Sequence, residues 1–316
     1  MNGTIKRFVH EHRTDWRFSD LYGLSERTLD CKQLVVKEVL QWKEETNLIP
    51  IFLDSLSCHF DGDSLKRNNS AIRGYSLVEK SASTPDDLRS LVSTLFEKEG
   101  YCLIRYPAGE AMFSSYYKKY MISHWALILD IQPEFIILMD TTGTSPYFEG
   151  QIGKVLWEHL PGHNCSAAIV RKEGGVRSWE HDFLDLVQDT IKEMKNHGLH
   201  NLQQYISFIS NLSVSEIVPR LERMELEVHS FRQVRELWNT AIRKQSIPPD
   251  YIMAGWIEEF EYVCRAWSLV LGVLMKWKRQ PERDYKQKLI DYLEPTYRSE
   301  KMLINELEQV LLKRGS

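Results

Sequence analysis

The spacing of apolar residues changes several times in the first half of the chain, which predicts a mixture of helices and strands. Apolar side chains recur at helical spacing after Cys31, so we expect a helix from there to about Lys43. Ser83-Thr84-Pro85 is typical of a helix start, and this second helix is expected to end near Gly100. The expected strands are residues 101–106, the two arms of a hairpin over 123–140, and 167–170.

The second half has an almost entirely helical pattern from Trp179 onward. The character of the sequence changes near Gly174-Gly175, where we place a domain boundary, so the expected domains are residues 1–174 and 175–316. About five helices are expected, the last of them from about Pro295 to Leu312. The sequence therefore predicts an α+β domain followed by an all-α helical domain.

Composition narrows the class of protein. The 316 residues are 43% hydrophobic and 27% charged, which is typical of a globular protein in water. The net charge of −4 and the lack of a long Lys/Arg run argue against nucleic-acid binding. No apolar stretch has the length of a membrane span, and the first ten residues lack the apolar core of a signal peptide. We expect a cytoplasmic protein that binds no membrane.

Five cysteines are scattered along the chain, and none belongs to a Cys-x-x-Cys pair. An odd, scattered set predicts neither a disulfide framework nor a zinc site. His159, His163 and Cys165 flank a Pro-Gly break that argues against a metal site there. A cysteine in such a protein is most often a small buried apolar residue, which suits Cys102 and Cys264.

Cys31 differs from the other cysteines because it opens a predicted helix. Thr28 or Asp30 can cap that helix. A thiol in the first turn is close to the positive end of the macrodipole and to unpaired backbone N–H groups, both of which favour the thiolate. We therefore take Cys31 as a candidate nucleophile.

The predicted hairpin carries a histidine near one end and an aspartate at the other. If the hairpin is symmetric about Gln132, His124 and Asp140 lie directly opposite each other. Opposed residues on antiparallel strands share a face, with Cβ atoms about 5 Å apart. Cys31, His124 and Asp140 are then predicted to be nucleophile, base and orienting carboxylate.

Other residues compete for these roles. Asp130 shares a face with His124 but lies six residues along the same strand, too far to orient its ring. Cys58-His59 is the other Cys/His pair, but neighbours in a strand point to opposite faces. Asp140 precedes Thr-Thr-Gly and also has a structural interpretation, as the residue that starts a turn.

Several segments resemble a known family. Leu29-Asp-Cys31 with the helix after it, and the later Ile49-Pro-Ile-Phe-Leu-Asp54, look like the N-terminal region of the BtrH type of butirosin-biosynthesis acyltransferase. The stretch from Tyr106-Pro-Ala to His124-Trp-Ala-Leu-Ile-Leu-Asp, with Asp140-Thr-Thr-Gly, resembles the same family. The resemblance covers about residues 20–165.

This resemblance implies a papain-like (C39-like) fold for the first domain and a cysteine-dependent acyltransferase activity. The acyl group would pass from an acyl or peptidyl carrier-protein thioester, through an acyl-cysteine, to a small-molecule amine, as in antibiotic and other specialised-metabolite biosynthesis. Cys31 would be the nucleophile, His124 the base and Asp140 its partner. No cofactor is implied, because a thioester is already activated. Two positions depart from the family: Asp30 directly precedes Cys31, and Glu26 stands where a papain-like enzyme carries an oxyanion-binding amide.

Other functions use the same residues. If water is the acceptor, the same triad is that of a cysteine peptidase or thioesterase. If the three residues have no catalytic role, the protein is a non-enzymatic binding module. A carrier protein is usually acidic, so a basic docking patch is expected at Lys118-Lys119 or on the Arg220 and Arg223 face. The tryptophans of the helical half either cover the site or form a hydrophobic core, and we favour the core interpretation.

Overall fold

The structure is a computed structural model that describes residues 17–67, 70–161, 163–174, 178–252 and 255–314. The chain forms two compact units. One comprises the chain up to Ile51 with Ile72–Gly175, and the other comprises Phe52–Ala71 with the chain from Val176. Residues 52–71 thus belong to the helical unit, although the sequence pattern assigned them to the first domain. Gly175 of the expected boundary, and the residues tested for a signal peptide, lie outside the described residues.

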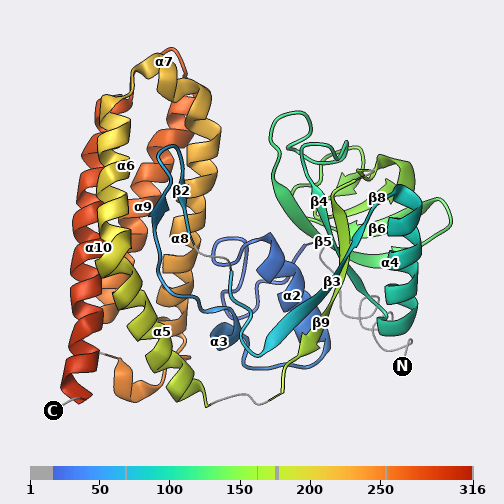
Figure 1. The fold of residues 1–316 in the computed structure, drawn as a ribbon, viewed down its shortest axis with the longest axis horizontal. Helices are drawn as coiled ribbons and strands as arrows, with labels where there is room; N and C mark the ends of the chain where they lie inside the picture. Colours follow the sequence, from blue (N-terminus) through green and yellow to red (C-terminus); the bar gives the residue numbers. More distant parts are fainter. Residues whose placement is uncertain (1–16, 68–69, 162, 175–177, 253–254, 315–316) are drawn as a thin grey trace. The chain divides into compact units, whose positions relative to one another are not determined.

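The first unit is an α+β structure built on one antiparallel sheet (Figure 1). Its strand order is β3-β9-β4-β5-β6-β8-β7. Helix α4 lies against β3, β4 and β9, whereas α2 lies against β5. The elements are α2 Cys31–Trp42, α3 Leu48–Phe52 (which runs one residue into the other unit), β3 Tyr75–Ala82, α4 Pro85–Glu99, β4 Cys102–Pro107, β5 Ser123–Ile131, β6 Phe135–Met139, β7 Phe148–Glu149, β8 Ile152–Leu156 and β9 Cys165–Lys172.

Local sequence signals explain where these helices begin and end. Thr84 caps α4 by accepting a hydrogen bond from the Asp87 N–H, and Gly100 ends the helix at φ +79°. Both helix limits predicted there are confirmed. The alternate residues Cys102, Ile104 and Tyr106 of β4 are buried in one cluster with α4. This cluster forms the core on one face of the sheet.

The second unit is a helical bundle that includes a short hairpin (Figure 1). Its four most buried tryptophans, Trp238, Trp256, Trp267 and Trp277, are inaccessible to solvent, so the core interpretation is confirmed for them. The elements are β1 His59–Phe60, β2 Leu65–Lys66, α5 Trp179–Glu193, the π-helical turn Met194–Gly198, α6 Leu199–Asn211, α7 Val214–Ile217, α8 Leu221–Arg243, α9 Trp256–Arg279 and α10 Lys286–Arg314.

The last helix starts earlier than the sequence pattern predicts. It begins at Lys286, and Pro295 lies inside it. Leu289 and Leu293 precede the proline and are fully buried, and the helix packs along α9 and α6. Burial of this apolar stripe outweighs the hydrogen bond that a proline removes.

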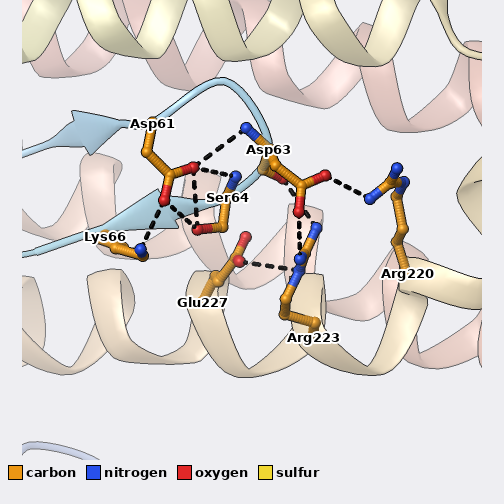
Figure 2. Close-up of polar contacts among 7 residues, drawn as sticks. All are labelled: Asp61, Asp63, Ser64, Lys66, Arg220, Arg223 and Glu227. Carbon is orange, nitrogen blue, oxygen red and sulfur yellow. Dashed lines mark hydrogen bonds and ion pairs between the residues drawn. The ribbon is translucent and has the colours of Figure 1, made fainter.

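Charged side chains join the β1–β2 hairpin to α8 and to Arg220, the residue just before α8 (Figure 2). Asp63, in the turn, is bound by Arg220 and by Arg223, whose Nη1 lies 2.5 Å from Asp63 Oδ2. Arg223 Nε is also 3.4 Å from Glu227 Oε1, so one guanidinium serves two carboxylates. Lys66 pairs with Asp61 at 2.5 Å. The Arg220 and Arg223 face, expected to be a basic patch, is therefore paired with an acidic turn.

Among the described residues, no helix combines the length and the apolar character needed to cross a bilayer.

Candidate functional site

Cys31 is the first residue of α2, as predicted. Asp30 is the N-cap, and its Oδ1 accepts a hydrogen bond of 2.9 Å from the Gln33 N–H. The Gln33 side chain returns to the Asp30 N–H at 3.4 Å, which completes a capping box. Of the two predicted caps, Thr28 instead hydrogen-bonds the Gly23 carbonyl. The thiol is half-buried at a helix N-terminus whose position is fixed by its own sequence.

His124 lies at the start of β5 and directly opposite Tyr106 of β4. The two rings meet edge to face with centroids 5.6 Å apart. Both side chains are almost fully buried, with His124 4% and Tyr106 1% exposed. The imidazole is therefore buried beside the Tyr106 ring on one face of the sheet.

The β5–β6 hairpin has a different register from the symmetric one expected. The turn closes between Gln132 and Phe135, and beyond it Asp130 pairs with Ile137. A β-bulge then shifts the register, so that Leu127 pairs with Met139. His124 and Asp140 are therefore not directly opposed, contrary to the expectation. They are still on one face, and His124 Nε2 is 3.1 Å from Asp140 Oδ1.

Asp140 is the most heavily hydrogen-bonded residue of the site. Its Oδ1 also accepts hydrogen bonds from the Thr142 N–H at 2.5 Å and the Thr142 hydroxyl at 2.8 Å, and its Oδ2 accepts one from Tyr106 Oη. Burial alone would raise the pKa of this carboxyl, but His124 and these donors hold it below its ordinary value. Asp140 also starts a turn, as its structural interpretation predicted, and it does so while its carboxylate contacts His124.

The thiol and the imidazole lie within hydrogen-bonding reach of each other. Because Nε2 of His124 is engaged by Asp140, Nδ1 is the ring nitrogen that can face Cys31. Burial alone would lower the pKa of His124, but the charges of Asp140 and Cys31 raise it well above its ordinary value. This arrangement favours an imidazolium that is paired with Asp140 and lies beside Cys31, the form that an activated cysteine requires.

The other cysteines have different surroundings. All four are buried, whereas Cys31 is half-buried. Burial raises the pKa of Cys58 and of Cys102 to about 12, and that of Cys165 to about 11. Cys58 belongs to the helical unit, and its neighbour His59 pairs with Glu193. This geometry does not support Cys58-His59 as an alternative Cys/His pair.

The structure brings together the three residues predicted from the sequence, and adds two that the sequence reasoning did not assign. Tyr106, near the end of β4, and Thr142, in the loop after β6, both hydrogen-bond Asp140. A signal for Thr142 was present, because Asp followed by Thr at the second position is typical of an Asx-turn. The role of Tyr106 could be identified only from the β4–β5 register, which places it opposite His124. Asp130 lies beyond the bulge and accepts a hydrogen bond from Gln132.

No protein-family model matches the chain, and no match to it is found among curated proteins. Within the described residues, no group of three or more His, Cys, Asp or Glu side chains is arranged to hold a metal ion.

Proposed function

We propose that the protein is a cysteine-dependent acyltransferase that uses Cys31, His124 and Asp140 as nucleophile, base and orienting carboxylate. The observation that carries the proposal is the continuous contact from a helix-start thiol through a buried imidazole to a buried carboxylate. Three residues far apart in the chain meet in this order. The same contact order supports a papain-like fold for the first unit.

The reaction proceeds in two steps whose protons pass through His124. In the first, the Cys31 sulfur bonds to the thioester carbonyl carbon, the carbon–sulfur bond to the carrier breaks, and the imidazolium gives its proton to the leaving thiolate. In the second, an amine attacks the acyl-cysteine, its surplus proton goes to His124, and Cys31 leaves as the thiolate. The Cys31 N–H, at the first helical position, has no intrahelical acceptor and suits the developing oxyanion.

A carrier protein as acyl donor is supported by the surface next to His124. The loop that joins β4 to β5 carries Lys118 and Lys119 and enters β5 at Ser123. Met112 and Met121 of the same loop are exposed, at 47% and 69%. Cations interspersed with apolar side chains suit an acidic partner that delivers a tethered acyl group.

The test is an intact-mass measurement after mixing the protein with a simple acyl thioester. Cys31→Ala should abolish the one-acyl mass gain, and Cys165→Ala, the same change at a buried cysteine outside the site, should retain it. Added amine should then discharge the acyl-enzyme faster than water does. Discharge by water alone would indicate a hydrolase, and no adduct on the wild-type protein would contradict an acyl-transfer function.

A further inference from the structure

The Asp140 carboxylate is 1% exposed, and its two oxygens have different partners. Oδ1 binds His124 and Thr142, whereas Oδ2 accepts a hydrogen bond from the phenol of Tyr106. A buried carboxylate without donors takes up a proton, because the interior disfavours its charge by several kcal/mol. The Tyr106 bond therefore bears on whether Asp140 is charged.

Tyr106 can act only as a donor to this carboxylate. Burial and the Asp140 charge raise the pKa of the phenol well above its ordinary value, so its proton stays on the oxygen. Its second neighbour, Thr142 Oγ1, is 3.5 Å away and itself donates to Asp140. The phenol proton has the carboxylate as its nearest acceptor.

The position of the phenol is set by packing of its ring. The ring contacts Phe113 at a centroid distance of 5.4 Å and His124 at 5.6 Å, and it belongs to the core cluster of the first unit. Because the ring makes these contacts and the hydroxyl makes the bond to Asp140, the two roles are separable. A phenylalanine at this position keeps the packing and removes the donor alone.

We propose that Tyr106 is a positioning residue of the site: its hydroxyl keeps Asp140 ionised and oriented, so that His124 can hold a proton beside Cys31. Tyr106 does not touch the reacting atoms and acts through Asp140 and His124. The inference rests on the proposed function for the identity of the reaction, but its effect on the thiol can be measured without any substrate.

The experiment compares Tyr106→Phe with Tyr101→Phe and the wild type. Tyr101 is equally buried, and its hydroxyl binds Val170 and Lys43 at the other end of β4, so its loss removes a buried phenol bond away from the site. The rate of Cys31 carbamidomethylation by iodoacetamide is measured against pH, with peptide mapping to isolate this cysteine. Tyr106→Phe should lower the rate at neutral pH by about tenfold, the effect of losing one hydrogen bond to a charged group.

The pH dependence separates positioning from packing. Loss of the phenol raises the pKa of Asp140, so reactivity should fall at a higher pH on acidification in Tyr106→Phe than in the wild type, and Tyr101→Phe should follow the wild type. An unchanged profile, or an equal change in both variants, would overturn the inference. Acylation that fails in every protein while this pH difference persists would refute the proposed function and leave the positioning role intact.

A second measurement uses the wild-type protein and does not depend on how a variant folds. With tyrosine labelled at Cζ with ¹³C, the Tyr106 signal should move at the pH at which Asp140 takes up a proton. A Tyr106 signal that is indifferent to that titration would overturn the inference.

Discussion

His124 and Asp140 share one face of the sheet because a bulge leaves Leu129 of β5 unpaired with β6. On the turn side of the bulge Asp130 pairs with Ile137, and on the far side Ile128 pairs with Leu138. If Leu129 were paired within a regular ladder, the turn-side register would continue and place Asp140 opposite Leu127. His124, three residues further along, would then point to the other face, because side chains alternate along a strand.

Insertion of one alanine between Ala126 and Leu127 should therefore separate His124 from Asp140. Deletion of Leu129 should not separate them, because it leaves Asp130–Ile137 and Ile128–Leu138 as consecutive pairs of a regular ladder. We expect the insertion variant to lose about 100-fold or more in Cys31 acylation, because its His124 ring would lie on the wrong face, whereas the deletion variant should retain most of the activity. Acylation rates and far-UV circular dichroism are measured together, and a folded insertion variant as active as the Leu129 deletion variant would refute the requirement for a shared face.

The bulge also shows what the sequence could and could not predict about the site. The helix start at Cys31 and the position of the hairpin followed from caps and turn residues, which act locally. The symmetric register was wrong by two residues, yet a shift of two keeps each side chain on its face, so the pairing of His124 with Asp140 survived. The bulge depends on tertiary packing and leaves no pattern that alternation reveals.

Other features could be identified only from the folded structure. Tyr106 is adjacent to Asp140 only through the pairing of three strands. The insertion of residues 52–71 into the helical unit follows from contacts such as the one between the Leu56 N–H and Thr190, 134 positions apart. Short sequence patterns carry no information about pairings at that separation.

The stability of the first unit should depend on pH through the His124–Asp140 pair. The pKa of His124 is raised from 6.5, so its contribution is complete below pH 6.5 and is lost as the pH rises through the folded value. The pKa of Asp140 is lowered from 3.8, so its contribution is complete above pH 3.8 and is lost as the pH falls through the folded value. The difference in unfolding free energy between wild type and His124→Gln should be largest between those two pH values. Denaturant titrations at a series of pH values test this, and a flat difference would contradict the pair.

Glu227 should make the packing of the β1–β2 hairpin against α8 weaken as the pH rises. This is the opposite of the effect of a carboxylate whose pKa is lowered by folding. Burial raises its pKa from 4.5 to about 7, and its Oε2 has no hydrogen-bond partner within the described part of the chain. The folded state thus binds the Glu227 proton more tightly than the unfolded chain does. The contribution of Glu227 to stability is therefore complete below pH 4.5 and is lost as the pH rises through about 7. Hydrogen exchange at the Leu65 amide should speed up between pH 5 and 8, after correction for intrinsic exchange, in the wild type but not in Glu227→Gln. Equal behaviour of the two proteins would refute the assignment.

The central claim is that His124 activates Cys31, and the most direct test is the rate of iodoacetamide labelling at each of the five cysteines. Each rate is divided by the rate for the same cysteine in the denatured chain, and the measurement is repeated in His124→Gln. We predict that Cys31 alone reacts faster in the folded wild-type protein than in the denatured chain, and that this excess disappears in His124→Gln. A Cys31 that reacts no faster when folded, or whose rate is unchanged in His124→Gln, would contradict the account.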